Sequence, residues 1–365
     1  MKISDVIFFL ETLAHPSLQE SYDNAGLITG DKGWECNGII CTLDTTEEVI
    51  MEAVSKKCNM VVSHHPIVFS GLKKINGKNY IEKAVIAAIK NDIAVYAIHT
   101  NLDNTLIGVN GKMARMLGLK NITTLAEKTN TLKKLFTFVP VDKAEQVRNA
   151  LFAAGGGQIG NYHECSFNVQ GKGTFTGQDG AKPYVGEINK RHYEEEIRIE
   201  VIFPSYLETT LISALKKAHP YEEVAYDIVN LSNANQSFGA GVLGDLPEQM
   251  TEVKFLNLLK ETFRVPVVRH SPLINKKVER IALCGGAGKF LIPIALASGA
   301  GFFVTADIKY HDFFDANDTM VIADIGHFES EQFTIDLLQE VLVQKFPNFA
   351  VLKTGVNTNP VNYFI

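Results

Sequence analysis

The first 125 or so residues alternate short apolar runs with segments of helical periodicity. Residues 38–43 (GIICTL), 58–63 (CNMVVS) and 93–98 (IAVYAI) are apolar runs typical of buried strands. Between them lie two helical segments, TTEEVIMEAVSKK and residues 81–90, the first with a threonine cap, acids in its first turn and lysines in its last. Strands joined by helical crossovers pair in parallel. The pattern therefore predicts an α/β fold with a mainly parallel sheet buried on both faces.

The pattern changes between about residues 131 and 231. Strand candidates alternate there with two helical segments, DKAEQVRNALFAAG and SYLETTLISALKKAH. The strand candidates are residues 135–139, 164–169, 196–203 and 223–229. The resulting order, strand–helix–strand–strand–helix–strand, predicts a split, ferredoxin-like α+β arrangement. About a hundred residues are enough for one such domain.

The α/β pattern resumes after this segment. The strands expected there are residues 278–283, 301–305 and 320–323, and the helices are residues 289–298 and 329–344. The polar stretch SNANQS (232–237) is the best linker candidate. We therefore predict a discontinuous α/β domain of residues 1–130 and 232–365, interrupted by an inserted domain of residues 131–231.

Composition excludes several classes of protein. With 365 residues, 46% hydrophobic and 21% charged, the chain can bury a sizeable core. A net charge of -6 argues against a nucleic-acid-binding surface, which is normally basic. No run of eighteen apolar residues predicts a membrane span, and the N-terminus fits an amphipathic helix better than a signal peptide. The five cysteines form no CxxC motif, so we expect reduced thiols and a cytoplasmic protein.

Imidazole and carboxylate groups follow three of the expected strands. His64 and His65 (in SHHPIVF) come after CNMVVS, and Asp103 (in HTNLD) comes after IAVYAI. His327 and Glu331 (in DIGHFESE) follow MVIA and, being four residues apart, share one face of a helix that begins there. Open α/β sheets place their sites at the carboxyl ends of their strands. These side chains are therefore expected to converge on one edge as a metal site.

The donor set indicates the chemistry of this site. Imidazole nitrogen and carboxylate oxygen without thiolate suit zinc, iron(II), manganese or similar divalent ions. Five ligands exceed one tetrahedral site and suit two metal ions with a bridging carboxylate, an arrangement that activates water for hydrolysis. Each motif also has a structural explanation: a histidine pair is commonly structural, and HxxxE spacing is common on helices. Only their convergence favours a metal.

Other polar residues near the strand ends are weaker candidates. His99 follows IAVYAI directly and either hydrogen-bonds a ligand or substrate or transfers protons. His311 lies in TADIKYHD, after the strand GFFV, and is a second candidate proton shuttle. In the same segment Asp307, Lys309 and Tyr310 could bind substrate, orient ligands or act as acids and bases. Structural hydrogen bonding is equally compatible with each of them.

Three further features favour a structural role. Asp44, after ICTL, is interpreted as a helix cap and not as a ligand. The stretch CGGAGK (284–289) lies between a strand and a helix, where backbone amides could hold a phosphate, but it lacks the GxxxxGK[ST] spacing. We favour a tight turn there. His219 in HPYEE ends a helix, where a cation is favourable, so this motif is not expected to be a ligand cluster.

The motifs SHHPIVF, HTNLD, TADIKYHD and GHFESE, in this order, resemble the signature segments of the Nif-three-like family, also labelled type-two GTP cyclohydrolase homologue. The resemblance covers about residues 1–125 and 235–365. It implies a three-layer fold, ring-shaped homohexamers and a dinuclear metal site. The implied metal ligands are His64, His65, Asp103, His327 and Glu331. The segment with HPYEEVAYDI (219–228) resembles the CutA/PII-like domain of the longer family members.

Two functions follow as hypotheses. The first is a metal-dependent hydrolase with two divalent ions, acting through activated water on a nucleotide-like or small cyclic substrate, with His99 or His311 transferring protons. In it, Lys309 or the glycine-rich turn would hold phosphate. The second is a non-catalytic metal-binding or regulatory oligomer whose inserted domain senses a ligand or partner. Nothing in the sequence identifies GTP as a substrate.

Overall fold

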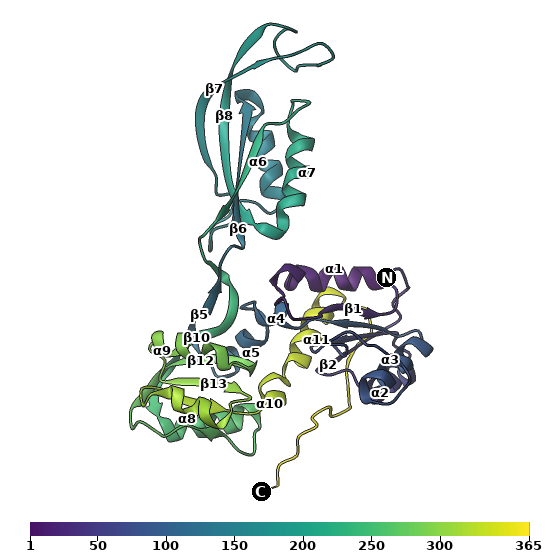
Figure 1. Cartoon of the computed structure of the whole chain (residues 1–365), viewed down its shortest axis with the longest axis vertical. Coiled ribbons are helices and arrows are strands. Elements are labelled where there is room, and N and C mark those ends of the chain that lie inside the picture. The colour runs from purple at the N-terminus through teal and green to yellow at the C-terminus, as the bar shows by residue number, and fades with distance from the viewer. Residues whose placement is uncertain (365) are drawn as a thin grey trace. The chain divides into compact units, whose positions relative to one another are not determined.

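The polypeptide folds into two units that differ in how their strands pair (Figure 1). The computed structural model describes residues 1–364, apart from the side chain of Gln236. The larger unit comprises Met1–Glu127 and Ser237–Ile365, and the smaller unit comprises Lys128–Gln236. In the part of the chain that is described, no helix is long and apolar enough to cross a membrane. The five cysteines are free thiols.

The first sheet of the larger unit has five strands in the order β1-β4-β3-β2-β15. Its strands are β1 (Gly26–Thr29), β2 (Ile39–Thr42), β3 (Met60–Ser63), β4 (Ala94–Ala97) and β15 (Val351–Lys353). The neighbours from β15 to β4 are parallel, and only the edge strand β1 is antiparallel to its neighbour. Helical crossovers α2 (Glu47–Ser55) and α3 (Tyr80–Lys90) join the parallel strands, as the apolar runs predicted.

The second sheet of the larger unit has six strands in the order β11-β14-β13-β12-β10-β5. Its strands are β5 (Lys120–Lys128), β10 (Asn235–Thr251), β11 (Arg269–His270), β12 (Lys277–Ala287), β13 (Phe302–Ala306) and β14 (Val321–Asp324). The strands β12, β13 and β14 are parallel, whereas β10 is antiparallel to β12 and β11 is antiparallel to β14. The fold is thus mixed α/β, and the parallel strands belong to two sheets instead of one. Apolar runs in the sequence indicate which segments are buried strands, but they do not indicate which strands pair with one another.

The core of the larger unit lies in three layers of side chains. The central layer joins both sheets to the helices between them, with Val62 on β3 and Val304 on β13 both fully buried. The preceding residue on β3, Val61, packs on the opposite face, against α2 and α3. This alternation explains why the strands are apolar throughout.

The remaining helical elements are α1 (Ile3–Leu13), η1 (Pro16–Leu18), α4 (Thr100–Asp103), α5 (Val109–Met116), α8 (Glu252–Phe263), η4 (Lys289–Leu291), α9 (Ile292–Ala297), η5 (Tyr310–Ala316), α10 (His327–Glu331) and α11 (Thr334–Lys345).

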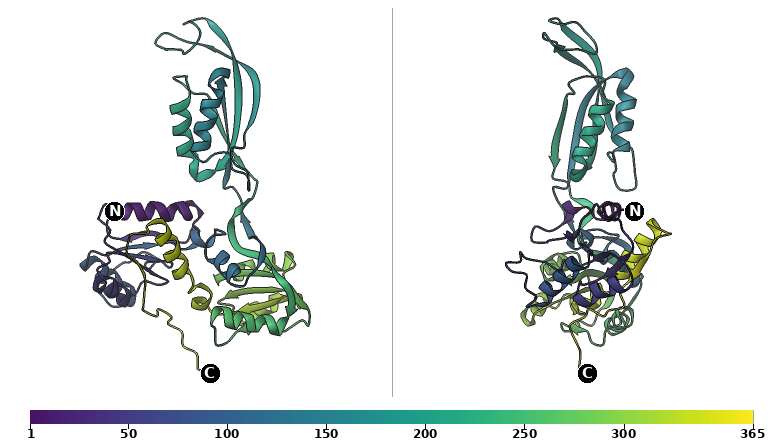
Figure 2. Two further views of the ribbon diagram at one scale, coloured as in Figure 1. Left: turned by 180° about the vertical axis from the view of Figure 1, so that it is seen from behind. Right: turned by 90° about the vertical axis from the view of Figure 1, so that its right-hand side faces the viewer.

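The smaller unit has the strand–helix–strand–strand–helix–strand order that the sequence predicted. Its elements are β6 (Leu132–Pro140), η2 (Val141–Lys143), α6 (Ala144–Ala153), β7 (Phe167–Thr176), β8 (Arg191–Pro204), η3 (Ser205–Leu207), α7 (Glu208–Ala218) and β9 (Tyr226–Leu231). The strands form an antiparallel sheet in the order β7-β8-β6-β9. Figure 2 shows α6 and α7 against one face of this sheet. Buried residues such as Val201 and Leu211 join that face to the helices.

Candidate metal centre

The five predicted ligands come from three places on the larger unit. His64 and His65 follow β3 directly, and Asp103 is the last residue of α4. His327 and Glu331 are the first and last residues of α10, which confirms the expected shared helix face. Gly326, with a φ of 89°, lets the chain turn sharply from β14 into this short helix. The structure therefore brings side chains more than 260 residues apart, His65 and Glu331, into contact.

Each imidazole in this cluster is oriented by a hydrogen bond at its Nδ1 atom. The acceptors are the Ile98 carbonyl for His64 at 2.9 Å, Asp44 for His65 at 2.7 Å, Asp23 for His99 at 2.8 Å and Asp307 for His327 at 2.8 Å. A proton held at Nδ1 leaves the Nε2 lone pair available to a metal ion or a substrate. The arrangement is the one that ligating histidines usually have in metalloproteins.

Glu331 lies at the centre of the cluster. Its Oε2 atom is 3.0 Å from Nε2 of His65 and 3.1 Å from Nε2 of His327. Its other oxygen, Oε1, is 4.0 Å from Nε2 of His64. Among the residues that the structure describes, potential ligand atoms within 4.8 Å of one another form two groups that could hold a metal ion. One consists of His64, His65 and His99, and the other of His65, His327 and Glu331.

Two polar atoms at the centre have no hydrogen-bond partner among the described residues. They are Nε2 of His64 and Oδ1 of Asp103, both buried and 3.6 Å apart. A buried polar atom without a partner costs about 1–3 kcal/mol. Such a cost is offset when the atom binds an ion, so the residues present fit a metal site.

The charges in the cluster are coupled. Burial lowers the pKa of His64 to about 3, which keeps this imidazole neutral and able to coordinate. Burial opposes a charge on His65, but hydrogen bonds to Asp44 and Glu331 outweigh it and raise the pKa of His65 to about 10. Burial, together with the Glu331 charge, raises the pKa of Asp103 well above its ordinary value. Burial would also raise the pKa of Glu331, but hydrogen bonds from His327 and His65 lower it well below the ordinary value.

A cavity of about 740 Å³ opens over the cluster and is lined by four of the five predicted ligands, all but the fully buried His64. This volume lies within the range of small-molecule sites. Aromatic side chains, among them Tyr22 and Phe69, form part of its wall, with ring centroids 6.3 Å apart. The C-terminal segment contributes Asn359 and Tyr363 to the same wall. The cavity could therefore admit a flat ring next to the imidazoles.

Residues 1–360 match the Duf34/NIF3 (NGG1p interacting factor 3) family. The chain belongs to this family. A relative from Halalkalibacterium halodurans, named GTP cyclohydrolase 1 type 2 homolog, is 37% identical over 371 residues and is matched over 100% of both chains. A relative of the same name from Bacillus subtilis is 36% identical over 93% of both chains. A solved Bacillus cereus structure, described as a protein related to NIF3, is 36% identical with a TM-score of 0.88, over 100% of this chain and 99% of that one.

The family resemblance drawn from four short motifs is thereby confirmed, and two positioning residues can be added to it. Asp23 lies in the loop after η1 and accepts hydrogen bonds from His99 and from Thr100. Burial opposes its charge, but these hydrogen bonds lower the pKa of Asp23 to about 2. Asp44 was expected to cap a helix, which is wrong: Thr46 caps α2, and Asp44 accepts from His65. No periodicity signals either contact, because both join distant segments.

Of the weaker candidates in this NIF3-family protein, Asp307 lines the cavity and orients His327. His311 is exposed on η5, contacts the ring of Tyr310 and is absent from the described lining of the cavity. Lys309 and Tyr310 are likewise outside that lining. A catalytic role for His311 therefore stays a prediction, whereas His99 lies at the cavity.

The glycine-rich turn (284–289) is poorly suited to bind a phosphate, because several of its hydrogen-bond donors already have partners. The backbone amides of Gly285, Gly286 and Gly288 already donate to the side chains of Asn110, Ser330 and Thr305, respectively. Lys289 is paired with Asp312 at 2.6 Å. The structural interpretation of this stretch therefore stands. His219, in contrast, is not a helix-end cation: it accepts from the Tyr221 amide and bonds the Phe138 carbonyl, and burial lowers its pKa.

Proposed function

We propose that the chain binds two divalent metal ions and uses them as a metal-dependent hydrolase. The observation that carries this proposal is the pair of buried atoms without hydrogen-bond partners, Nε2 of His64 and Oδ1 of Asp103, facing one another across 3.6 Å. The Nδ1 partners of the four clustered imidazoles support it, because an imidazole that donates from Nδ1 can coordinate a metal ion through Nε2 once that atom carries no proton.

The ligands divide naturally around Glu331. Its Oε1 side faces His64, and Asp103 lies next to His64. Its Oε2 side faces His65 and His327. A carboxylate between two sets of donors suits a bridging ligand, and imidazole with carboxylate suits zinc, iron or manganese. We therefore assign these five residues as the metal ligands.

The remaining residues at the cavity supply orientation and proton transfer. Bound divalent ions act as Lewis acids and lower the pKa of water toward neutrality. Asp23 stays ionised and fixes the proton of His99 at Nδ1, so Nε2 of His99 can accept a proton from, or return one to, a molecule in the cavity. The aromatic wall around Tyr22 and Phe69 would hold a planar ring near this imidazole. We accordingly propose a nucleotide-like or small cyclic substrate.

The cyclohydrolase name belongs to the relatives and identifies no substrate of this chain. The alternative proposal is a non-catalytic metal-binding or regulatory oligomer, for which the inserted unit, with its separate core, is the supporting feature. We further propose that this unit is CutA/PII-like and that the chain forms homohexamers, as the family resemblance implies. Light scattering of the purified protein would measure the hexamer directly, and a monomer would contradict it.

Turnover by metal-loaded protein decides between these functions. The purified chain, reconstituted with zinc, iron(II) or manganese, is incubated with a panel of nucleotides, cyclic amides and phosphoesters. Hydrolysis that is lost in His64→Ala and Glu331→Ala, with unchanged circular dichroism, supports the enzyme. His311→Ala serves as a matched histidine variant outside the cavity lining. Stoichiometric metal without turnover on any compound favours the regulatory role, and absence of metal binding refutes the site itself.

A further inference from the structure

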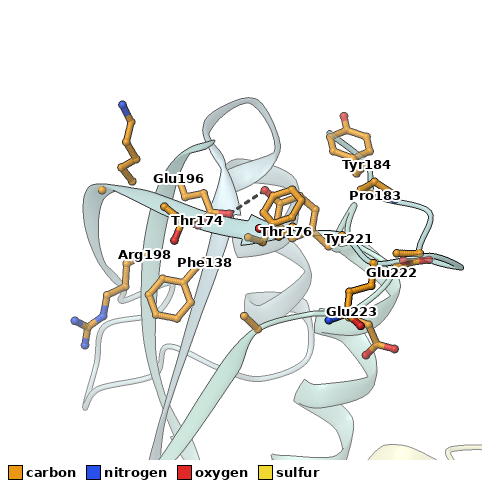
Figure 3. Close-up of a pocket in the computed structure, with 18 of the residues that line it drawn as sticks. Phe138, Thr174, Thr176, Pro183, Tyr184, Glu196, Arg198, Tyr221, Glu222 and Glu223 are labelled. Carbon is orange, nitrogen blue, oxygen red and sulfur yellow. Dashed lines mark hydrogen bonds between the residues drawn. The ribbon is translucent and has the colours of Figure 1, made fainter. Parts of the chain in front are cut away.

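The inserted unit contains a cavity of its own, separate in sequence from the candidate metal centre (Figure 3). Its volume is about 690 Å³, and all its lining residues lie between Phe138 and Ala225. They come from β6, β7 and β8, from the loop after β7, and from the segment 221–225 before β9, which includes part of the HPYEE motif. Alternate residues on β8, such as Val201, face the helices, so Glu196 and Arg198 lie on the uncovered face of the sheet. The cavity is therefore built on that face.

A buried carboxylate lies in the cavity wall. Glu196 is only 9% exposed, and its Oε1 atom accepts a hydrogen bond of 2.8 Å from the Tyr221 hydroxyl. Its Oε2 atom lies beside Gly173, where any Cβ atom would be 2.2 Å away. Gly173 has no side chain, so the Glu196 carboxylate can occupy the space that a side chain at this position would fill. Burying a charged group is costly unless partners compensate it, and among the described residues the Tyr221 hydroxyl is the one hydrogen-bond donor to Glu196, which leaves room for a further donor.

Aromatic rings line the cavity beside Tyr221, the residue that bonds this carboxylate. The ring centroid of Tyr221 is 6.2 Å from that of Phe175 and 6.2 Å from that of Tyr184. Phe138 adds a further ring to the lining. Aromatic faces attract cations and also cover apolar groups. The wall therefore suits a molecule with an apolar body and a positive charge.

The charges of the lining favour a cation over an anion. Glu222 and Glu223 join Glu196, whereas the only cationic side chains of the described lining are Lys172 and Arg198. Both are already paired outside the lining, Lys172 with Glu195 at 3.0 Å and Arg198 with Glu200 at 3.1 Å. Arg198 also stacks on Phe136, and Figure 3 draws its guanidinium pointing away from the bond between Glu196 and Tyr221. A phosphate or carboxylate ligand would meet the negative charges of Glu196, Glu222 and Glu223 here.

We propose that this cavity is a binding site for a small organic cation, a primary amine or amidinium on an apolar body. Its charged group donates to Glu196 and its apolar body packs against Phe175 and Tyr184. The exposed acids of the HPYEE motif, Glu222 and Glu223, add negative charge to the lining. The Tyr221 hydroxyl holds the Glu196 carboxylate in place for this contact. This site lies wholly within the inserted unit and is independent of the metal chemistry proposed above.

Titration calorimetry of the full-length protein tests the site with benzylamine, phenethylamine and benzamidine as probes. Benzyl alcohol and phenylacetate serve as neutral and anionic matches of similar size. EDTA is present throughout, so that amines cannot bind through a metal ion in the larger unit. We expect saturable binding of at least one cationic probe and none of phenylacetate.

Variants locate the binding. Glu196→Gln keeps the size of the side chain and an acceptor for Tyr221, and should weaken cation binding about tenfold or more, as for loss of a charge-assisted hydrogen bond. Glu145→Gln, an exposed acid on α6 outside the cavity, should leave it unchanged. Tyr221→Phe serves as a second variant of the same contact. Unfolding curves for every variant separate loss of binding from loss of fold. Equal binding of benzyl alcohol and benzylamine, unchanged binding in folded Glu196→Gln, or no binding of any cationic probe at millimolar concentration would each overturn the proposal.

Discussion

Replacing Asp44 by asparagine perturbs the metal centre without touching a proposed ligand. The Asp44 carboxylate accepts from Nδ1 of His65 at 2.7 Å through Oδ1 and from the Thr358 hydroxyl at 2.8 Å through Oδ2. Asparagine can serve one of these donors through its carbonyl, but its NH₂ group cannot accept from the other. The substitution therefore removes both the negative charge behind His65 and one acceptor of the pair.

The expected effect is confined to one metal ion. Partners that orient a ligating histidine contribute about 10–100-fold to metal affinity, or about 1.4–2.8 kcal/mol. The side chain of Asp44 is 35% exposed, whereas that of Asp307, which orients His327 in the same way, is 55% exposed. Solvent screens the more exposed pair more strongly. Asp307→Asn should therefore weaken binding less than Asp44→Asn, although the two hydrogen bonds are nearly equal in length.

Competition with a chromophoric chelator measures both dissociation constants and the stoichiometry. We expect Asp44→Asn to keep one ion at its original affinity and to bind the other at least tenfold more weakly. Asp312→Asn, which disrupts an ion pair with Lys289 away from the cavity lining, controls for general loss of charge. Unchanged affinity for both ions in a folded Asp44→Asn protein would refute the assignment of His65 as a ligand oriented by Asp44.

Three more outcomes can be measured. Gly286→Ala places a Cβ atom 2.4 Å from Oε1 of Glu331 at a residue whose φ is 62°. The variant should therefore lose about 1–2 kcal/mol of unfolding free energy and bind metal more weakly. The control Gly71→Ala, whose added Cβ atom meets open space, should change neither the unfolding free energy nor metal binding. The raised pKa values of His65, about 10, and His327, about 9, mean that both imidazoles keep a second proton at neutral pH, and metal binding must displace these protons. Calorimetry at pH 7.5 in buffers of different ionisation enthalpy should show the proton release. Metal affinity that does not rise with pH from 6 to 8 would contradict this expectation. EDTA should lower the melting temperature of the larger unit alone, because metal at a hundred times its dissociation constant adds about 2.7 kcal/mol to the unfolding free energy of the unit that binds it. An equal shift in the melting temperatures of both units, measured by calorimetry, would exclude a site confined to the larger unit.

The proposed ligands could be chosen from the sequence because each lies directly after a strand or on one turn of helix. His64 and His65 follow an apolar run, and His327 and Glu331 have the spacing of a helix face. The partners that orient them could not be chosen in this way. Asp23 lies 76 residues from His99, and no periodic pattern connects a loop aspartate to an imidazole so far along the chain. His311 shows the converse: it has suitable chemistry after a strand, but η5 leaves it exposed.

The sequence by itself determined the main elements, the family and the residue types of the candidate metal centre, because these depend on local periodicity and on motifs a few residues long. Only the tertiary structure decided that the parallel strands form two sheets, that Glu331 lies between His65 and His327, and that HPYEE lines a second cavity. These features are contacts between segments distant in the chain. Their free energy comes from burying apolar faces and pairing charges across the fold, and the pattern of any single segment does not encode its partner.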